Sequence, residues 1–234
     1  MIDSAQGRRI SAPRATKRLQ RSFLGRDPVL VAPELLGKLL QRGPLLARIV
    51  EVEAYGGADD DASHAFRGKT PRNATMYGPP GHLYVYFTYG LHYCANVVCG
   101  GEGEAGAVLL RALAPLAGLE VMAERRSTAR KPLFRRDESR PAAKGKAAPT
   151  LREQDLCSGP AKLCQAFGLD RRSDGYDLIR GNEGIVLLDD GTEPPNKPSV
   201  GTRIGLAEGC SARDVPWRWW VPGEPSVSGP RGSR

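Results

Sequence analysis

The chain has 234 residues, of which 40% are hydrophobic and 26% are charged, and its formal net charge is +8. These values are typical of a globular protein with room for one sizeable core or two small ones. No apolar run approaches the length of a membrane span and the first residues lack a signal-peptide core, so we expect neither a membrane protein nor an exported one. The positive charge favours polyanions such as nucleic acid, although a merely basic protein would show the same balance.

Three stretches lack a hydrophobic pattern. Residues 1–21 carry six Arg or Lys against one Asp, which predicts a flexible basic tail. A second basic stretch, 127–154, interrupts patterned sequence and predicts a long, poorly ordered surface loop. The end of the chain, 223–234, is rich in Pro, Gly and Ser and predicts a loose terminus. One folded domain, 22–222, is therefore expected.

Hydrophobic periodicity predicts the elements of that domain. Four leucines of "APELLGKLL" (32–40) share a helical stripe, with Pro33 near the first turn, so this segment is expected to be a helix. Further helices are predicted at "LAGLEVMAERR" (116–126) and "SGPAKLCQAFGL" (158–169), the last with Ser158 as N-cap and Gly168 as its end. Strands are predicted at 45–55, 82–87, 92–99, 106–113, 184–190, 202–207 and 217–221. Strands dominate and helices flank them, which predicts an α+β domain around a curved, mainly antiparallel sheet.

The strand "LLARIVEVEAY" contains two glutamates of possible chemical importance. Glu51 and Glu53 lie on the same side of an extended strand, roughly 6.5–7 Å apart. Two carboxylates at this distance suit acid/base hydrolysis of a glycosidic bond. A solvated strand face is the simpler alternative.

Three other polar features of the sequence each admit two interpretations. The "DDD" at 59–61 suits Mg²⁺, but no further carboxylate cluster follows it, so a solvated loop is favoured over a metal site. His64 is either a catalyst or an ordinary hydrogen-bonded residue. Lys162 lies in the first turn of its helix, where a cation opposes the helix dipole, unless an anion such as phosphate binds there.

The stretch "HLYVYFTYGLHYCAN" (82–96) concentrates the aromatic residues of a chain that is only 6% aromatic. Alternation places Tyr84 and Tyr86 on the face opposite the core residues. Gly90 predicts a tight hairpin with Tyr89 at or beside its tip, where a ring projects outward. These rings either pack on the sheet or serve as a wedge and a stacking platform for nucleobases.

Five cysteines are scattered without a CxxC pair, namely Cys94, Cys99, Cys157, Cys164 and Cys210. Their spacing argues against a zinc ribbon or an iron–sulfur cluster. With no export signal, an intracellular location is expected, in the cytoplasm and nucleoid of a bacterium or the nucleus of a eukaryote.

Three blocks of the sequence, in the same order, resemble the alkyladenine (3-methyladenine) DNA glycosylase family. They are "RIVEVEAYGGADDDASHAFRGKTPRNATMYGPPGHLYVYFTYGLHYCANVV", "GAVLLRALAPLAGLE" and "LCSGPAKLCQAFGL", and the similarity extends over roughly 24–221. The resemblance implies a single compact α+β domain, a β-hairpin that projects toward DNA, and a monomer that excises damaged purines from double-stranded DNA without cofactor or metal.

The resemblance also implies residue roles. Glu53 is the expected base that activates water, and Arg111 the residue that helps hold the water and Glu53. Expected pocket residues are Tyr55, His64 and Tyr86, which stack on the extruded base, and Asn96, which clashes with the 2-amino group of guanine. Tyr89 is expected to intercalate in the duplex, and Thr70 and Lys162 to lie near the DNA backbone.

The expected activity is therefore that of a monofunctional glycosylase in base excision repair. It would flip alkylated or deaminated purines from the duplex and leave an abasic site. Because no lysine stands beside Glu53, Schiff-base lyase chemistry is not expected. Two alternatives remain open at this point: a nucleic-acid-binding module without catalysis, and a carbohydrate glycosidase that uses Glu51 and Glu53.

Overall fold

The fold is organised by one long strand, β3 (Leu45–Tyr55), which coincides with the strand predicted around the two glutamates. Along one edge it pairs with β6 (Ala107–Ala117). On the other edge β2 (Leu39–Arg42) covers its beginning and β9 (Arg218–Trp220) covers its end. Neighbouring strands therefore hold both edges of the segment that carries the glutamates.

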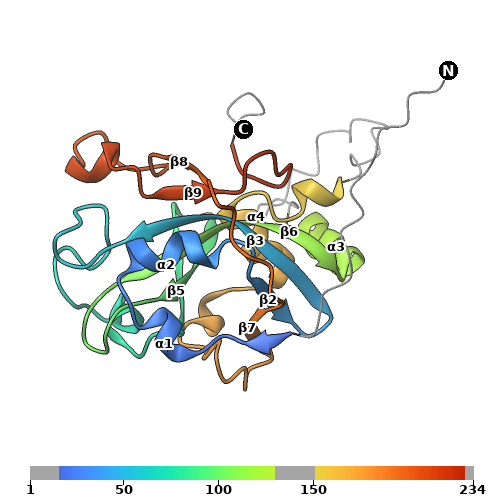
Figure 1. Ribbon diagram of the computed structural model, residues 1–234, viewed down its shortest axis with the longest axis horizontal. Coiled ribbons are helices and arrows are strands. Elements are labelled where there is room, and N and C mark those ends of the chain that lie inside the picture. Colours follow the sequence, from blue (N-terminus) through green and yellow to red (C-terminus); the bar gives the residue numbers. More distant parts are fainter. Residues whose placement is uncertain (1–15, 130–150, 230–234) are drawn as a thin grey trace, which may run out of the picture.

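The computed structural model describes residues 16–129 and 151–229, and within them nine strands form one antiparallel sheet. The remaining strands are β1 (Lys17–Arg18), β4 (Leu83–Thr88), β5 (His92–Val98), β7 (Ile185–Asp189) and β8 (Ser199–Gly201). The order across the sheet is β1-β7-β2-β3-β6-β5-β4, and β8 pairs with β9 beside this path (Figure 1). The predicted α+β class, one compact domain with a curled antiparallel sheet, is confirmed.

Helices in the described residues are few and short. The α-helices are α1 (Arg21–Leu24), α2 (Pro28–Leu35), α3 (Leu119–Ala129) and α4 (Pro160–Phe167), and 3-10 turns lie at Ala74–Tyr77, Glu153–Asp155, Arg171–Ser173 and Ser211–Asp214. α3 and α4 pack against each other, and α4 also contacts β5 and β6 (Figure 1). Of the helices described, none has the length and apolarity to cross a membrane.

The helix predicted over 32–40 is wrong in its position. α2 ends at Leu35, and Pro33 lies inside it rather than near its first turn. Gly37 follows with φ of 88°, a left-handed conformation that ends the helix, and Leu39 then begins β2. A run of buried leucines is compatible with both a helix and a buried strand. The apolar pattern alone therefore does not show where the helix ends and the strand begins.

Two smaller predictions also differ from the structure. The N-cap of α4 is Gly159, and Ser158 makes no capping bond, although Gly168 ends the helix in the left-handed conformation as predicted. The strand predicted at 202–207 is absent, and the backbone N–H of Ile204 donates to the Glu53 carboxylate instead of to a neighbouring strand.

Folded structure extends beyond the boundaries predicted at both ends. Lys17 and Arg18 pair with β7, so the sheet begins inside the stretch expected to be a tail, whose residues 1–15 lie outside the described residues. At the other end Val227 and Ser228 are buried, although 223–234 was expected to be loose. Of the loop expected at 127–154, residues 127–129 complete α3, and 130–150 lie outside the described residues.

Candidate active site

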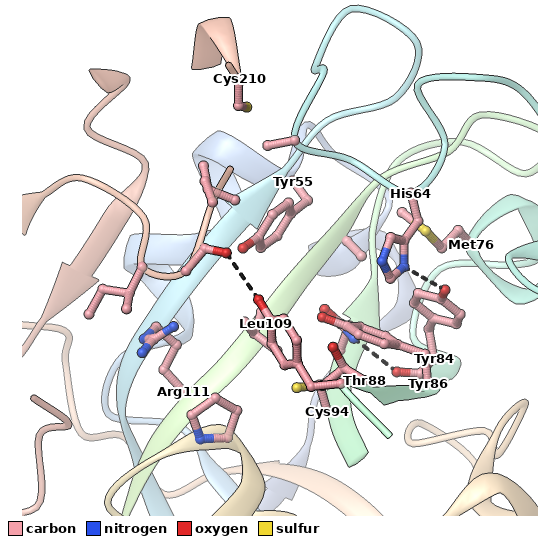
Figure 2. A pocket seen from close by; sticks show the side chains of 18 of the residues that line it. Tyr55, His64, Met76, Tyr84, Tyr86, Thr88, Cys94, Leu109, Arg111 and Cys210 are labelled. Carbon is pink, nitrogen blue, oxygen red and sulfur yellow. Dashed lines mark hydrogen bonds between the residues drawn. The ribbon is translucent and has the colours of Figure 1, made fainter. Parts of the chain in front are cut away.

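A cavity of about 430 Å³ lies between the β4–β5 hairpin, the end of β3, β6 and the segment 204–210 (Figure 2). Six of the nine residues to which the resemblance gives a role line it: Tyr55, His64, Tyr86, Tyr89, Asn96 and Arg111. Figure 2 shows Tyr55 and Arg111 on one side, and His64 and Tyr86 across from them. The structure therefore brings these residues together from four strands, β3, β4, β5 and β6, and two loops.

Glu53 lies directly behind the cavity wall and is fully buried. Its Oε2 accepts a hydrogen bond from the Tyr55 hydroxyl at 2.9 Å. Its Oε1 accepts the backbone N–H of Ile204 at 2.7 Å and lies 3.0 Å from a guanidinium nitrogen of Arg111. All three partners line the cavity, so only these residues separate the carboxylate from the interior of the cavity.

The surroundings of Glu53 perturb its titration. Burial raises the pKa of Glu53, while Arg111 and the hydrogen bonds from Ile204 and Tyr55 act in the opposite direction. Burial, together with the negative charge of Glu53, raises the pKa of Tyr55 well above its usual value, so the phenol remains a donor. A carboxylate with a raised pKa beside a cavity is suited to accept a proton.

Arg111 lies between the two glutamates because the pairing of β3 with β6 is irregular at this point. The register shifts on both sides of Glu51 and leaves Arg111 without a direct partner on β3. Bulges of this kind redirect side chains and are frequent beside active sites. Here Arg111 Nε donates to Glu51 at 2.8 Å, while another nitrogen of the same guanidinium contacts Glu53.

Glu51 is also fully buried, so the solvated strand face considered for the glutamates is wrong. Arg111, Arg218 and Ser228 surround its carboxylate. The two arginines each donate through Nε at 2.8 Å, and Ser228 donates through its backbone N–H at 2.6 Å and its hydroxyl at 2.8 Å. With these four donors, Glu51 belongs to a structural network rather than to the cavity wall.

Three aromatic rings form the opposite wall. His64 Nδ1 and the Tyr84 hydroxyl are 2.9 Å apart, and the rings of His64 and Tyr86 meet edge to face with centroids 4.3 Å apart (Figure 2). Burial and the charge of Arg72 lower the pKa of His64, which favours the neutral imidazole near pH 7. The wall therefore presents uncharged aromatic surface with a few polar edges, the character expected of a site for a planar ring.

Asn96 lines the cavity on the same side as these three rings. It lies opposite Tyr84 in the β4–β5 pairing and is almost completely buried. Its amide nitrogen donates to the Tyr84 carbonyl at 3.1 Å. This bond fixes the side chain, so a ligand in the cavity meets an amide group that cannot easily move aside.

The hairpin predicted between the two tyrosine-rich strands is confirmed. Tyr89 stands at its tip with φ of 51° and 75% of its surface exposed, and Gly90 follows it. The Tyr89 hydroxyl donates to the carbonyl of Gly205 at 3.2 Å. In this state the tip thus contacts the segment on the far side of the cavity.

Comparison with known proteins identifies the family. The model of the family described as methylpurine-DNA glycosylase (MPG) matches residues 22–225. The chain belongs to this family. A protein of Burkholderia lata, provisionally named a 3-methyladenine DNA glycosylase, is 51% identical over 213 residues, 91% of each chain. A protein of Streptomyces avermitilis with the same provisional name is 42% identical over 224 residues, 94% of each chain.

As a member of the methylpurine-DNA glycosylase family, the protein is a DNA N-glycosylase, a hydrolase of DNA repair whose partner is DNA. Both residues expected near the DNA backbone lie outside its cavity lining. Thr70 is exposed, and its N–H and hydroxyl both donate to Asn73 Oδ1. Lys162 donates to the Ser158 hydroxyl at 2.9 Å at the start of α4, and Pro160 of the same turn lines the cavity.

The acidic loop 59–61 of this glycosylase is not a solvated loop throughout, because two of its carboxylates bond to distant parts of the chain. Asp60 is buried and forms a bidentate pair with Arg203 at 2.7 and 2.9 Å. Asp61 accepts the N–H groups of Ser211 and Ala212. Among the described residues, no group of three or more His, Cys, Asp or Glu could hold a metal ion. The loop instead holds the segment that closes one side of the cavity.

Some residues of the site have no signal in the sequence, unlike Tyr84, which strand alternation places on the same face as Tyr86. Ser228 lies in a stretch whose composition indicates a loose end, and Ile204 acts through its backbone N–H, which no side-chain pattern reveals. Only the fold brings together residues that are 150 or more positions apart in the sequence, so local patterns cannot predict these contacts.

Proposed function

We propose that this glycosylase flips alkylated or deaminated purines out of duplex DNA, hydrolyses the N-glycosidic bond and leaves an abasic site for base excision repair. The observation that carries the proposal is the buried carboxylate of Glu53 behind a cavity lined by aromatic rings. In this proposal a monomer without a cofactor does the chemistry, and 3-methyladenine, 7-methylguanine, hypoxanthine and ethenoadenine are the lesions to compare.

Glu53 is the proposed general base. It takes a proton from water as the oxygen bonds to C1′ of the sugar, while the base departs with the electrons of the glycosidic bond. Its raised pKa and its place next to the wall support this role. Its negative charge would also stabilise the oxocarbenium character of the sugar.

Arg111 is the proposed partner of this base. It contacts Glu53 at 3.0 Å and also lines the cavity, so a water on the cavity side of this ion pair would meet both groups. The interaction with Arg111 lowers the pKa of Glu53 and so opposes the effect of burial. Tyr55, which donates to the other oxygen, fixes the carboxylate in one rotamer.

The cavity walls are the proposed base-recognition site. Tyr55, His64 and Tyr86 offer ring surfaces from both sides, and stacking on an aromatic side chain contributes about 1–3 kcal/mol per base. Extrusion of a base costs a few kcal/mol, so this stacking offsets much of that cost. Asn96, fixed by its bond to Tyr84, is the proposed group that rejects guanine through its 2-amino group.

Tyr89 is the proposed wedge that fills the space left by the extruded base. Its exposure at the hairpin tip makes it available to a duplex. Entry into DNA requires the ring to leave Gly205, whose carbonyl now accepts its hydroxyl. Thr70 and Lys162 are proposed to contact the DNA backbone, and damaged purines to be preferred over normal ones.

The two competing interpretations fit the site less well. A carbohydrate glycosidase would need Glu51 and Glu53 as an active pair, but Glu51 already accepts four hydrogen bonds from buried donors. A binding module has no need of a buried carboxylate, which is costly to desolvate.

Release of free base tests the proposal. Alkylated duplex DNA supplies 3-methyladenine and 7-methylguanine, and synthetic duplexes supply hypoxanthine and ethenoadenine. The wild-type protein should release at least one of these bases, and far less of any base from undamaged duplex. Glu53→Gln, prepared identically, controls for contaminating glycosylases. Binding of all duplexes without release of any base would contradict the proposed function. Light scattering should give the mass of one chain.

A further inference from the structure

Arg203 is a buried arginine that neither the family's catalytic chemistry nor the cavity lining uses directly. Its side chain is fully buried, and both terminal nitrogens bond to Asp60, itself 2% exposed. The same guanidinium donates to the carbonyls of Ala54 at 3.0 Å and Ala212 at 3.2 Å. One side chain thus joins the end of β3, the acidic loop and the segment over the cavity.

The guanidinium of Arg203 also contacts two aromatic rings. It lies 4.9 Å from the centroid of Tyr55 and 5.1 Å from that of Trp217. Its Nε is buried without a hydrogen-bond partner. An unpaired buried donor is unfavourable, so the pair with Asp60 and the ring contacts must hold the side chain there.

Arg203 and its neighbour contact three consecutive residues of β3. Ile204 donates its N–H to Glu53, and Arg203 contacts the Ala54 carbonyl and the Tyr55 ring. Two of the three groups that hold the Glu53 carboxylate, the Ile204 N–H and the Tyr55 hydroxyl, therefore depend on where Arg203 lies.

We infer that Arg203, held by Asp60, is a positioning residue that aligns the Tyr55 hydroxyl and the Ile204 N–H on the Glu53 carboxylate. This inference rests on the proposed role of Glu53 as the base. It gives a role to the acidic loop, since Asp60 orients Arg203 while Asp61 holds residues 211 and 212 of the same segment.

A pH profile distinguishes positioning from a purely structural role. Both hydrogen bonds favour the ionised carboxylate, and each lowers the pKa of Glu53. Loss of Arg203 should therefore raise that pKa and move the acidic limb of the rate profile to higher pH. The charge of Arg203 itself also interacts with Glu53, so its loss acts in the same direction as loss of the two hydrogen bonds. The other groups that interact electrostatically with Glu53 come from several elements, namely Arg111 on β6, Tyr86 on β4, Cys94 on β5 and Tyr55 on β3.

The experiment measures single-turnover release of methylated purines from alkylated duplex DNA between about pH 5 and 9, with spontaneous release subtracted. In Arg203→Met the acidic midpoint should rise by about one unit, the shift that corresponds to one lost hydrogen bond to a charged group. Arg203→Lys keeps the charge without the bidentate pair, so its midpoint should lie between those of Met and wild type. Asp60→Asn, which preserves shape, should shift it in the same direction.

Arg48→Met is the matched control. Arg48 lies on β3, the strand that carries Glu53, and it is not in the cavity wall. It forms its own bidentate pair with Asp190, at 3.1 and 2.7 Å. This variant should lose thermal stability to a similar degree and keep the wild-type midpoint. An unshifted midpoint in both Arg203→Lys and Asp60→Asn, or an equal shift in Arg48→Met, would overturn the inference.

Two further variants separate this inference from the proposed function. If positioning acts through Tyr55, then adding Arg203→Lys to Tyr55→Phe should shift the midpoint less than Arg203→Lys does alone. Glu53→Gln should remove most of the activity and its acidic limb. If Glu53→Gln keeps full activity, the base assignment fails. If it is inactive while Arg203 and Asp60 variants titrate as wild type, only the inference about Arg203 fails.

Discussion

The interior end of β3 and the tip of the β4–β5 hairpin border the same cavity but differ in burial and in how firmly hydrogen bonds hold their side chains. At the end of β3, Glu51 and Glu53 are fully buried, and charged or backbone donors fix their carboxylates. At the tip, Tyr89 is three-quarters exposed, and one hydroxyl bond to Gly205 holds it to the opposite side. One region is pre-organised, and the other is free to meet a partner.

This difference predicts which substitutions change the rate of excision and which change the affinity for duplex DNA. Fixed, buried charges act on a transition state because they need no reorganisation during the reaction. An exposed ring contributes binding energy only when a duplex surrounds it. Substitutions at the end of β3 should therefore lower the rate at unchanged affinity, and those at the tip should affect affinity as well.

Glu53→Gln should have the largest effect on excision. Glutamine keeps the shape and accepts the bond from Tyr55, but it cannot take a proton from water. Single-turnover excision should fall by at least about 10²-fold, the low end for a general base. Affinity for lesion-containing duplex should stay within a few-fold, because the charge matters in the transition state. Parallel excision and binding measurements check both parts.

Glu51→Gln is the internal control for this variant. It leaves Arg111 and Arg218 with less compensating charge in a buried network, and breaking such a network costs about 3–5 kcal/mol of stability. Denaturant unfolding should show this loss, while excision by the protein that remains folded should fall much less than in Glu53→Gln. The opposite order of the two excision rates would show that the catalytic assignment is wrong.

The interior region was only partly predictable from sequence. Strand alternation placed Glu51 and Glu53 on one side of β3, and the resemblance to the glycosylases assigned Arg111 to Glu53. The bulge that directs Arg111 between them has no local signature, since it depends on register with β6. Burial of both carboxylates was also missed, because Ser228, a donor from the far end of the chain, encloses one of them.

Tyr89→Ala should have the next largest effect. Without the Tyr89 ring, nothing fills the space that the extruded base leaves in the duplex, and about one stacking interaction is lost. Duplex affinity and excision should therefore each fall by about 10-fold. Tyr89→Phe is the matched control, because it keeps the ring and loses only the bond to Gly205, and it should excise at least as fast as wild type. Wild-type excision by Tyr89→Ala would show that the exposed tip is not the wedge.

Asn96→Ser should have a smaller effect, confined to the choice of base. The shorter side chain leaves room for the 2-amino group of guanine, so release of unmodified guanine relative to hypoxanthine should rise by about 3- to 10-fold. Fold and duplex affinity should change little, since the hydrogen bond at stake is the one from the Asn96 amide to the Tyr84 carbonyl. An unchanged ratio of the two released bases would place selectivity elsewhere in the cavity.

The hairpin region was easier to predict, for a physical reason. Its two strands and its turn are contiguous in sequence, so alternation and one glycine suffice to place Tyr84, Tyr86 and Tyr89. The segment opposite the tip was harder, because residues 202–207 resemble a strand in composition. Their backbone instead bonds to Glu53, more than 100 residues earlier. Local patterns predict local elements, whereas the closure of the cavity depends on contacts between distant segments.

Removal of residues 1–15 should have the smallest effect. These residues carry Arg8, Arg9 and Arg14 against Asp3, and a cut at this point leaves β1 intact. Each phosphate contact adds about 0.9 to the slope of log affinity against log salt, so the slope should fall by at most about 3. Excision at saturating enzyme should stay at the wild-type rate, because neither the end of β3 nor the hairpin tip is altered. Binding titrations from 50 to 300 mM salt measure the slope. An unchanged slope would mean that the folded domain alone supplies the electrostatic attraction to DNA.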